Sequence, residues 1–267
     1  MIDIDALDAV VVPLLDQAGE GEQIDVAAAA VASTSVLAYD GEVEKLTVAD
    51  TAAIGVRVIR DGRMGFASAG SLDPEIAAET LREARDNMAF AEPDPHVFVP
   101  ESDGVAVTPQ PEKWSAEVEA MALDEKIALA VDLERRTREL DDRITGVRNA
   151  GYGDERRVSL LATSTGLRAA SRATMASLAV SAMASEGGRT QTGFGQDAQR
   201  NPRDLDLEEV ATDAAHRTTR MLGATQPSSA RLTVVLEPRM AASFVSIIGG
   251  MLSGDRVLKG RTPVSYT

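Results

Sequence analysis

Three side chains with metal-binding donors follow one another at helical spacing near residue 212. Glu209, Asp213 and His216 stand at positions i, i+4 and i+7 of a segment with helical periodicity, so they share one face of the predicted helix. Two carboxylates and an imidazole are donors that zinc accepts. The same face also carries Arg217, however, at the spacing at which Asp213 forms an ordinary surface ion pair. We therefore interpret the cluster as a solvated helix face.

The residue types that most often perform catalysis are scarce in this sequence. It has no cysteine, which excludes disulfides, thiolate metal sites and cysteine nucleophiles, and its only histidines are His96 and His216. A Ser-His-Asp triad would need one of these histidines, and the sequence has no Gly-x-Ser-x-Gly turn. Adjacent carboxylates such as Asp141 and Asp142 arise by chance in a chain with 42 acidic residues. The residues by themselves therefore indicate no catalytic site.

The charge of the chain limits its partners. Its 267 residues include 27 Lys and Arg against 42 Asp and Glu, a formal net charge of −15. Such an excess repels phosphate and anionic lipid, so we expect no nucleic-acid partner and no membrane partner. The first residues are acidic where a secretory signal is basic, and the apolar runs are too short to span a bilayer. These features predict a soluble, cytoplasmic protein. An acidic DNA mimic that binds a nucleic-acid enzyme is the alternative interpretation of the charge.

Apolar periodicity predicts an α+β fold with antiparallel sheets and packed helices, in two N-terminal segments plus the start of a third, C-terminal domain. In the first segment, residues 1–92, Asp61-Gly62 lies between two strand-like runs and predicts a hairpin. An aspartate and a proline at 73–74 predict the start of a helix. Residues 93–113 are rich in proline and are expected to form a linker.

The second segment, residues 114–223, is predicted to combine helices with a β meander. A helix is expected over 124–140, with the charged residues Glu134–Glu139 on its solvated face. Farther along, glycine-containing turns at Gly151–Asp154, Ser164–Gly166 and Glu186–Gly188 are expected to separate runs of strand length, and Gly193–Gly195 is expected to form a further turn. Connections as short as these favour antiparallel over parallel strands.

The final segment, residues 224–267, is expected to begin a third domain. It is predicted to hold a strand at 231–236 and an apolar helix at 238–252. A lone strand and helix cannot bury both of their faces. We therefore interpret the sequence as an N-terminal fragment of a longer protein whose C-terminal domain is incomplete here.

Several segments of the chain, taken together and in this order, resemble the TldD/PmbA family. They are the hairpin Gly55–Ser68, the helix start Leu72–Glu75, the second-domain start Asp142–Ile144, the turn Thr163–Gly166, and the third-domain start Val234–Ala242 with Leu252–Gly254. Thr163 stands where the family usually has asparagine.

The resemblance implies a peptidase complex in which a TldD-type subunit pairs with a PmbA (TldE)-type subunit and acts on unfolded or peptide substrates. The TldD-type subunit carries a His-Glu-x-x-x-His metal motif early in its third domain. In this chain Ser246, Ile247 and Met251 occupy that stretch, and none of them can bind zinc and activate its water as the motif requires. No histidine follows His216.

The resemblance therefore implies the PmbA-type subunit of a heterodimer. We expect no catalytic residue, no metal ligand and no cofactor in this chain, with zinc in a TldD-like partner. Neither the residues nor the resemblance identifies the peptide-binding residues. Two other functions stay open: an acidic binding or gyrase-modulating protein without a peptidase role, and a metallopeptidase whose ligands lie beyond residue 267.

Overall fold

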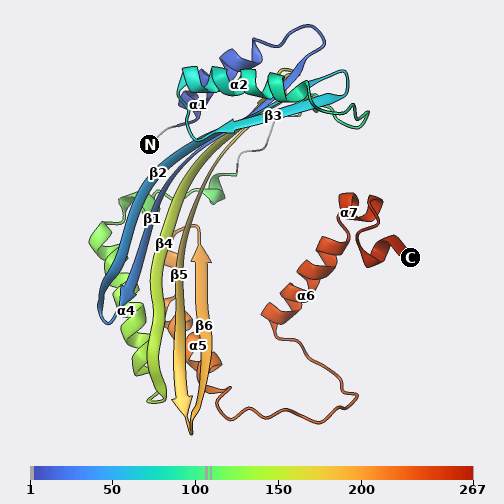
Figure 1. The fold of residues 1–267 in the computed structure, drawn as a ribbon. Coiled ribbons are helices and arrows are strands. Elements are labelled where there is room, and N and C mark those ends of the chain that lie inside the picture. The colour runs from blue at the N-terminus through green and yellow to red at the C-terminus, as the bar shows by residue number, and fades with distance from the viewer. Residues whose placement is uncertain (1–2, 106–107, 109, 267) are drawn as a thin grey trace. The chain divides into compact units, whose positions relative to one another are not determined.

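The structure is a computed structural model that describes residues 3–105, 108 and 110–266. It divides into two compact units, Met1–Ala224 and Thr225–Thr267. Unit 1 is a large antiparallel sheet with packed helices, and unit 2 is helical (Figure 1). The predicted α+β class is confirmed.

One antiparallel sheet of six strands, in the order β3-β2-β1-β4-β5-β6, organises unit 1. The strands are β1 (Gln23–Tyr39), β2 (Glu42–Arg60), β3 (Arg63–Ala69), β4 (Ile144–Thr163), β5 (Arg168–Glu186) and β6 (Arg189–Gln199). Most neighbours are consecutive hairpins, but β1 pairs with the distant β4, from Asp25 opposite Thr163 to Ala38 opposite Ala150. This pairing joins strands of the predicted segments 1–92 and 114–223 in a single sheet. The division of the chain into those segments stays a prediction.

In the described part of unit 1, helices cover one face of the sheet and not the other. Along β1 every even-numbered residue from Ile24 to Ala38 is buried, whereas the odd-numbered ones are half-buried or exposed, as in an antiparallel sheet with one covered face. The helices α1 (Ile4–Leu15) and α2 (Pro74–Met88) pack near one end of the strands. The helices α3 (Glu117–Ala120), α4 (Leu123–Glu139) and α5 (Leu207–Thr219) pack near the other end. Each end has its own apolar core.

Two tight turns connect the first three strands. Asp61 and Gly62 join β2 to β3 with φ of 53° and 70°, which confirms the predicted hairpin. Asp40 and Gly41 join β1 to β2 with φ of 54° and 80°. Positive φ at both central residues is the condition for the type I′ turn, and aspartate followed by glycine meets it at low cost.

Two of the predicted turns are wrong, because their glycines lie inside strands. Gly193 and Gly195 belong to β6, and Gly151–Asp154 belongs to β4. A Cβ at Gly195 would lie 2.0 Å from the carbonyl oxygen of Val210 on α5. A Cβ at Gly151 would lie 2.9 Å from the carbonyl oxygen of Val36 on the neighbouring strand. These glycines therefore permit close backbone approach and form no turn.

The prediction that Glu134 lies on a solvated helix face is also wrong. Its residue is 1% exposed, on the side of α4 that faces the sheet. Its two carboxylate oxygens accept hydrogen bonds from the backbone N–H groups of Asp40 and Gly41, at 2.9 and 3.0 Å. Arg138 donates to one of the same oxygens at 2.9 Å. Glu134 thus ties α4 to the hairpin tip between β1 and β2.

A second ionic contact lies at the other end of the sheet. The Glu22 carboxylate accepts hydrogen bonds from Arg85 on α2, at 3.0 and 2.8 Å, and from the backbone N–H of Gly19 at 3.0 Å. The hydrogen bond from Arg85 is the main cause of a pKa for Glu22 below the ordinary glutamate value. The pair joins the chain just before β1 to α2.

Unit 2 consists of helix α6 (Pro238–Met251), helix α7 (Gly254–Leu258) and a short 3-10 helix at Pro263–Tyr266. The predicted apolar helix is confirmed as α6. The predicted strand at 231–236 is wrong: those residues form neither helix nor strand, and the described part of unit 2 has no second strand with which they could pair. Within the described residues no helix, α6 included, is long and apolar enough to cross a membrane.

Replacing Glu134 by alanine should destabilise the protein by about 2 kcal/mol, because charge-assisted hydrogen bonds to two backbone amides are lost. The matched control is Glu139→Ala on the same helix, since Glu139 forms only an exposed ion pair with Arg135. That control should cost less than about 0.5 kcal/mol. Urea unfolding at pH 7 measures the free energy of unfolding of both variants. Equal losses would contradict the role assigned to Glu134.

The Glu22–Arg85 pair should stabilise the fold only above acidic pH. The folded pKa of Glu22 lies below its unfolded value of about 4.3, so its contribution is present above that pH and is lost as the pH falls through the folded pKa. Glu22→Gln should therefore cost about 1–2 kcal/mol at pH 7. Urea unfolding over a pH series should show this difference shrinking in acid. A difference that does not change with pH would exclude the linkage.

Candidate functional site

The residues that the resemblance places in the stretch of the metal motif lie on α6. Ser246 and Ile247 are exposed and Met251 is half-buried. They offer a hydroxyl, an alkyl group and a thioether, which do not form a zinc ligand set. Among the residues that the structure describes, no group of three or more His, Cys, Asp or Glu side chains could hold a metal ion. On their donor chemistry, the side chains of Ser246, Ile247 and Met251 do not fit zinc.

The structure places Glu209, Asp213 and His216 on α5 without assembling them into a metal-holding group. Asp213 lies 2.7 Å from Arg217, the surface ion pair that the spacing predicted. The opposite face of α5 packs on β6, where the glycines of that strand allow close contact. His96 is exposed in the loop after α2, and its backbone N–H donates to Asp94.

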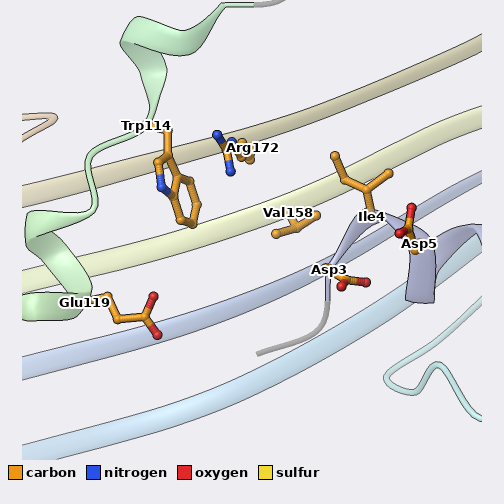
Figure 2. Close-up of a pocket in the computed structure, with 7 residues that line it drawn as sticks. All are labelled: Asp3, Ile4, Asp5, Trp114, Glu119, Val158 and Arg172. Carbon is orange, nitrogen blue, oxygen red and sulfur yellow. The ribbon is translucent and has the colours of Figure 1, made fainter.

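A hollow on the helix-bearing side of the sheet, of about 430 Å³, lies between the start of α1 and Trp114 (Figure 2). Its floor is Val158 of β4. Around it stand one aromatic, one basic, one aliphatic and three acidic side chains: Trp114, Arg172, Ile4, Asp3, Asp5 and Glu119. Figure 2 shows Trp114 and Arg172 side by side, with Asp3, Ile4 and Asp5 across the hollow.

Several polar groups of this hollow are already engaged within the protein. The Arg172 guanidinium lies 5.1 Å from the centre of the Trp114 ring, a cation–π distance. Glu119 lies 2.5 Å from Arg156, and that contact holds the pKa of Glu119 below its usual value. Asp3 caps α1 by accepting from the Ala6 N–H. The described residues around the hollow therefore include no nucleophile paired with a base. They could contact a bound group, but they do not form a catalytic arrangement.

A buried cluster of titratable side chains ties α4 to the sheet. Lys126 of α4 is 7% exposed, and its Nζ lies 2.5 Å from Oδ2 of Asp154. The Tyr152 hydroxyl donates to the same oxygen at 2.8 Å. Burial, and then this hydrogen bond, raise the pKa of Tyr152 above its ordinary value. None of the three lines the hollow of Figure 2, so we assign them a structural role.

Sequence reasoning missed both of these groups. In the sequence, Lys126 lies in a segment predicted as a helix, and Tyr152 lies in a segment predicted as a glycine-containing turn. Only the register of β4, in which Tyr152 and Asp154 point to the same face, brings them under α4. Trp114 is the chain's single tryptophan and could have indicated the hollow. Its partner Arg172, however, lies far along the chain, so the sequence does not show the pair.

Two family models match the chain in sequence order. The first domain of the PmbA/TldA metallopeptidases matches residues 24–88, and the central domain of the same metallopeptidases matches residues 116–222. The first match spans β1 to α2, and the second spans α3 to α5. Together they cover more than half of the chain.

Two curated proteins are similar along nearly all of the chain. A protein named metalloprotease PmbA from Escherichia coli O157:H7 is 26% identical over 245 residues, which are 91% of this chain and 54% of that protein. A protein named metalloprotease from Methanothermobacter thermautotrophicus is 24% identical over 276 residues, covering 97% and 57%. The chain thus spans about half the length of these curated relatives.

Solved structures share the fold. A candidate modulator of DNA gyrase from Bacteroides thetaiotaomicron superposes with a TM-score of 0.80 at 18% identity, over 96% of this chain and 58% of that one. TldE from Thermococcus kodakarensis gives 0.66 at 19% identity, over 79% and 46%. At these identities the likeness concerns the fold alone. On the two ordered domain matches, which the curated similarities support, the chain belongs to the PmbA/TldD metallopeptidase family.

Proposed function

We propose that this chain is the PmbA/TldE-like subunit, lacking a metal motif, of a two-subunit cytoplasmic metallopeptidase that processes unfolded peptides. The proposal is carried by Ser246, Ile247 and Met251 on α6. By the resemblance, they stand in the stretch where the TldD-type subunit has two histidines and a glutamate. Membership of the metallopeptidase family supports the peptidase context. Zinc then belongs to a TldD-like partner, and this chain needs no cofactor of its own.

In this proposal the chain contributes binding surface. Its sheet offers strand edges and a face that no helix of unit 1 covers. A strand edge binds an extended peptide through backbone hydrogen bonds, which are the same for every sequence. Such binding suits a peptidase that accepts unfolded chains with modest selectivity.

A second candidate function is modulation of another protein, without any role in proteolysis. The net charge of −15 favours it, and the Bacteroides thetaiotaomicron protein of the same fold is described as a candidate gyrase modulator. Acidic proteins can compete with nucleic acid for a basic surface. This function needs neither zinc nor a TldD-like partner, so the two candidates separate in one experiment.

Co-expression with a TldD-like protein of the same genome tests the first candidate. The chain alone should hold no stoichiometric zinc and cleave no unstructured peptide, whereas the co-purified complex should do both. Zinc is measured by elemental analysis and cleavage by mass spectrometry. As a matched control, Glu209→Ala combined with His216→Ala should leave the zinc content of the complex unchanged, since that cluster forms no metal site.

The other outcomes assign other functions. Zinc and cleavage in the chain alone would make it an independent metallopeptidase, and the assignment of Ser246, Ile247 and Met251 would be wrong. Failure to associate with any TldD-like protein, together with inhibition of gyrase by the chain alone, would favour the modulator.

A further inference from the structure

Half of strand β2 has no partner on its outer side. β3 pairs with β2 only from Ile54 to Arg60. Figure 1 shows β2 continuing well past the short β3. Among the residues that the structure describes, no strand pairs with the outer side of Glu42–Ala53. Every residue of this outer edge is exposed or half-buried.

The register shows which backbone groups face outward. The two-residue turn at Asp61–Gly62 makes Arg60 and Arg63 a hydrogen-bonded pair, so Arg60 directs its N–H and C=O toward β3. In antiparallel strands this direction alternates residue by residue. The N–H and C=O groups of the four even-numbered residues farther along the edge therefore point away from β1. These residues are Leu46, Val48, Asp50 and Ala52.

Between Leu46 and Ala52 this edge carries little of the protection that free strand edges usually have. Proteins protect such edges with proline, charged side chains (lysine above all) or bulges, and Asp50 is the one charged residue in this range. Between Glu42 and Ala53 there is no proline and a single lysine, Lys45, and the one bulge lies near the hairpin tip. Leu46 and Val48 leave 42% and 67% of their surface exposed. The edge therefore has both the backbone groups and the apolar side chains that an added strand would contact.

We propose that the outer edge of β2, from Leu46 to Ala52, binds an extended basic segment of a peptide by adding it to the sheet as a further strand. The inference rests on the proposed peptidase function, for which it names the binding element and the charge of the peptide. The unpaired part of the strand has three carboxylates, of Glu42, Glu44 and Asp50, and one ammonium group, of Lys45, in a chain of net charge −15. Apolar residues of the peptide lie beside Leu46 and Val48, and basic residues lie beside Asp50.

The charges disfavour a second copy of this chain at the same edge. A two-fold axis perpendicular to the sheet keeps each side chain on its own face. Lys45 and Asp50 lie on opposite faces of β2, so Lys45 meets only Thr47, Ala49 or Thr51 in the registers centred on residues 46 to 48. Self-pairing therefore gains no ion pair, while it brings two acidic chains together.

Peptide binding to the full chain tests the proposal without metal or partner subunit. The probe is a fluorescein-labelled peptide of alternating lysine and valine, and binding is measured by fluorescence anisotropy at low salt. Val48→Pro removes an outward N–H at a position where proline leaves the pairing with β1 intact. It should weaken binding about fivefold, as expected for one lost hydrogen bond. The control Val48→Thr keeps that N–H and should bind as the parent does.

A second variant tests whether the carboxylate of Asp50 selects basic peptides, and it introduces no proline into the strand. Asp50→Lys should weaken the lysine–valine peptide about threefold and improve binding of a glutamate–valine peptide. Circular dichroism checks that both variants fold. If Val48→Pro does not fold, an N-methylated probe that cannot donate from one edge replaces it and should bind about fivefold more weakly than the unmodified peptide.

Three results would overturn the proposal. The first is equal affinity of the parent and Asp50→Lys for both peptides. The second is equal affinity of Val48→Pro and Val48→Thr for the lysine–valine peptide. The third is a concentration-dependent dimer of the chain that Val48→Pro abolishes, which would make a second copy the occupant. If the co-expressed complex still cleaves peptides in those cases, the proposed function stands and only the β2 edge is rejected.

Discussion

The antiparallel pairing of β1 with β4 is the contact on which the rest of unit 1 depends. It joins residues that lie more than a hundred positions apart, from Asp25 with Thr163 to Ala38 with Ala150. Every other strand pair in the sheet is a local hairpin. Closing so long a loop costs chain entropy before any contact is gained, so a continuous ladder and cores at both ends must offset it. Without this pairing the chain would form two three-stranded meanders, each with an extra free edge.

Because helices pack on one face of the sheet, the buried charged residues of unit 1 lie between those helices and the sheet. The helices of unit 1 pack on the even-numbered side of β1, so a charged helix residue that is buried on that side needs a partner there. Glu134 meets two backbone amides, and Lys126 meets Asp154. The glycines of β6 follow from the same geometry, because α5 approaches that strand too closely for a Cβ at Gly195.

Local chemistry was predictable from the sequence, and long-range partners were not. The Asp61-Gly62 hairpin, the start of α2 and the apolar helix α6 follow from turn, capping and periodicity rules that involve neighbouring residues. The strand glycines were misassigned because a turn and a close approach use the same residue. Glu134 looked solvated because the hairpin tip that it binds lies far away in sequence. The sequence contains the residues of the Figure 2 hollow, but not the sheet register that brings them together.

The distribution of chemistry over the molecule favours recognition by backbone over recognition by side chains. The enclosed ionic groups are occupied within the fold, and beside Trp114 the Glu119 carboxylate pairs with Arg156 while the Arg172 guanidinium lies over the tryptophan ring. Among the groups that the described part of unit 1 leaves without a strand partner is a row of peptide groups along β2, and one face of the sheet has no helix of the described unit 1 on it. Peptide groups recognise extended chains regardless of sequence, whereas carboxylates along the same strand select charge. Under the proposed function, a subunit built in this way would hold an unfolded chain while a partner supplied the hydrolysis.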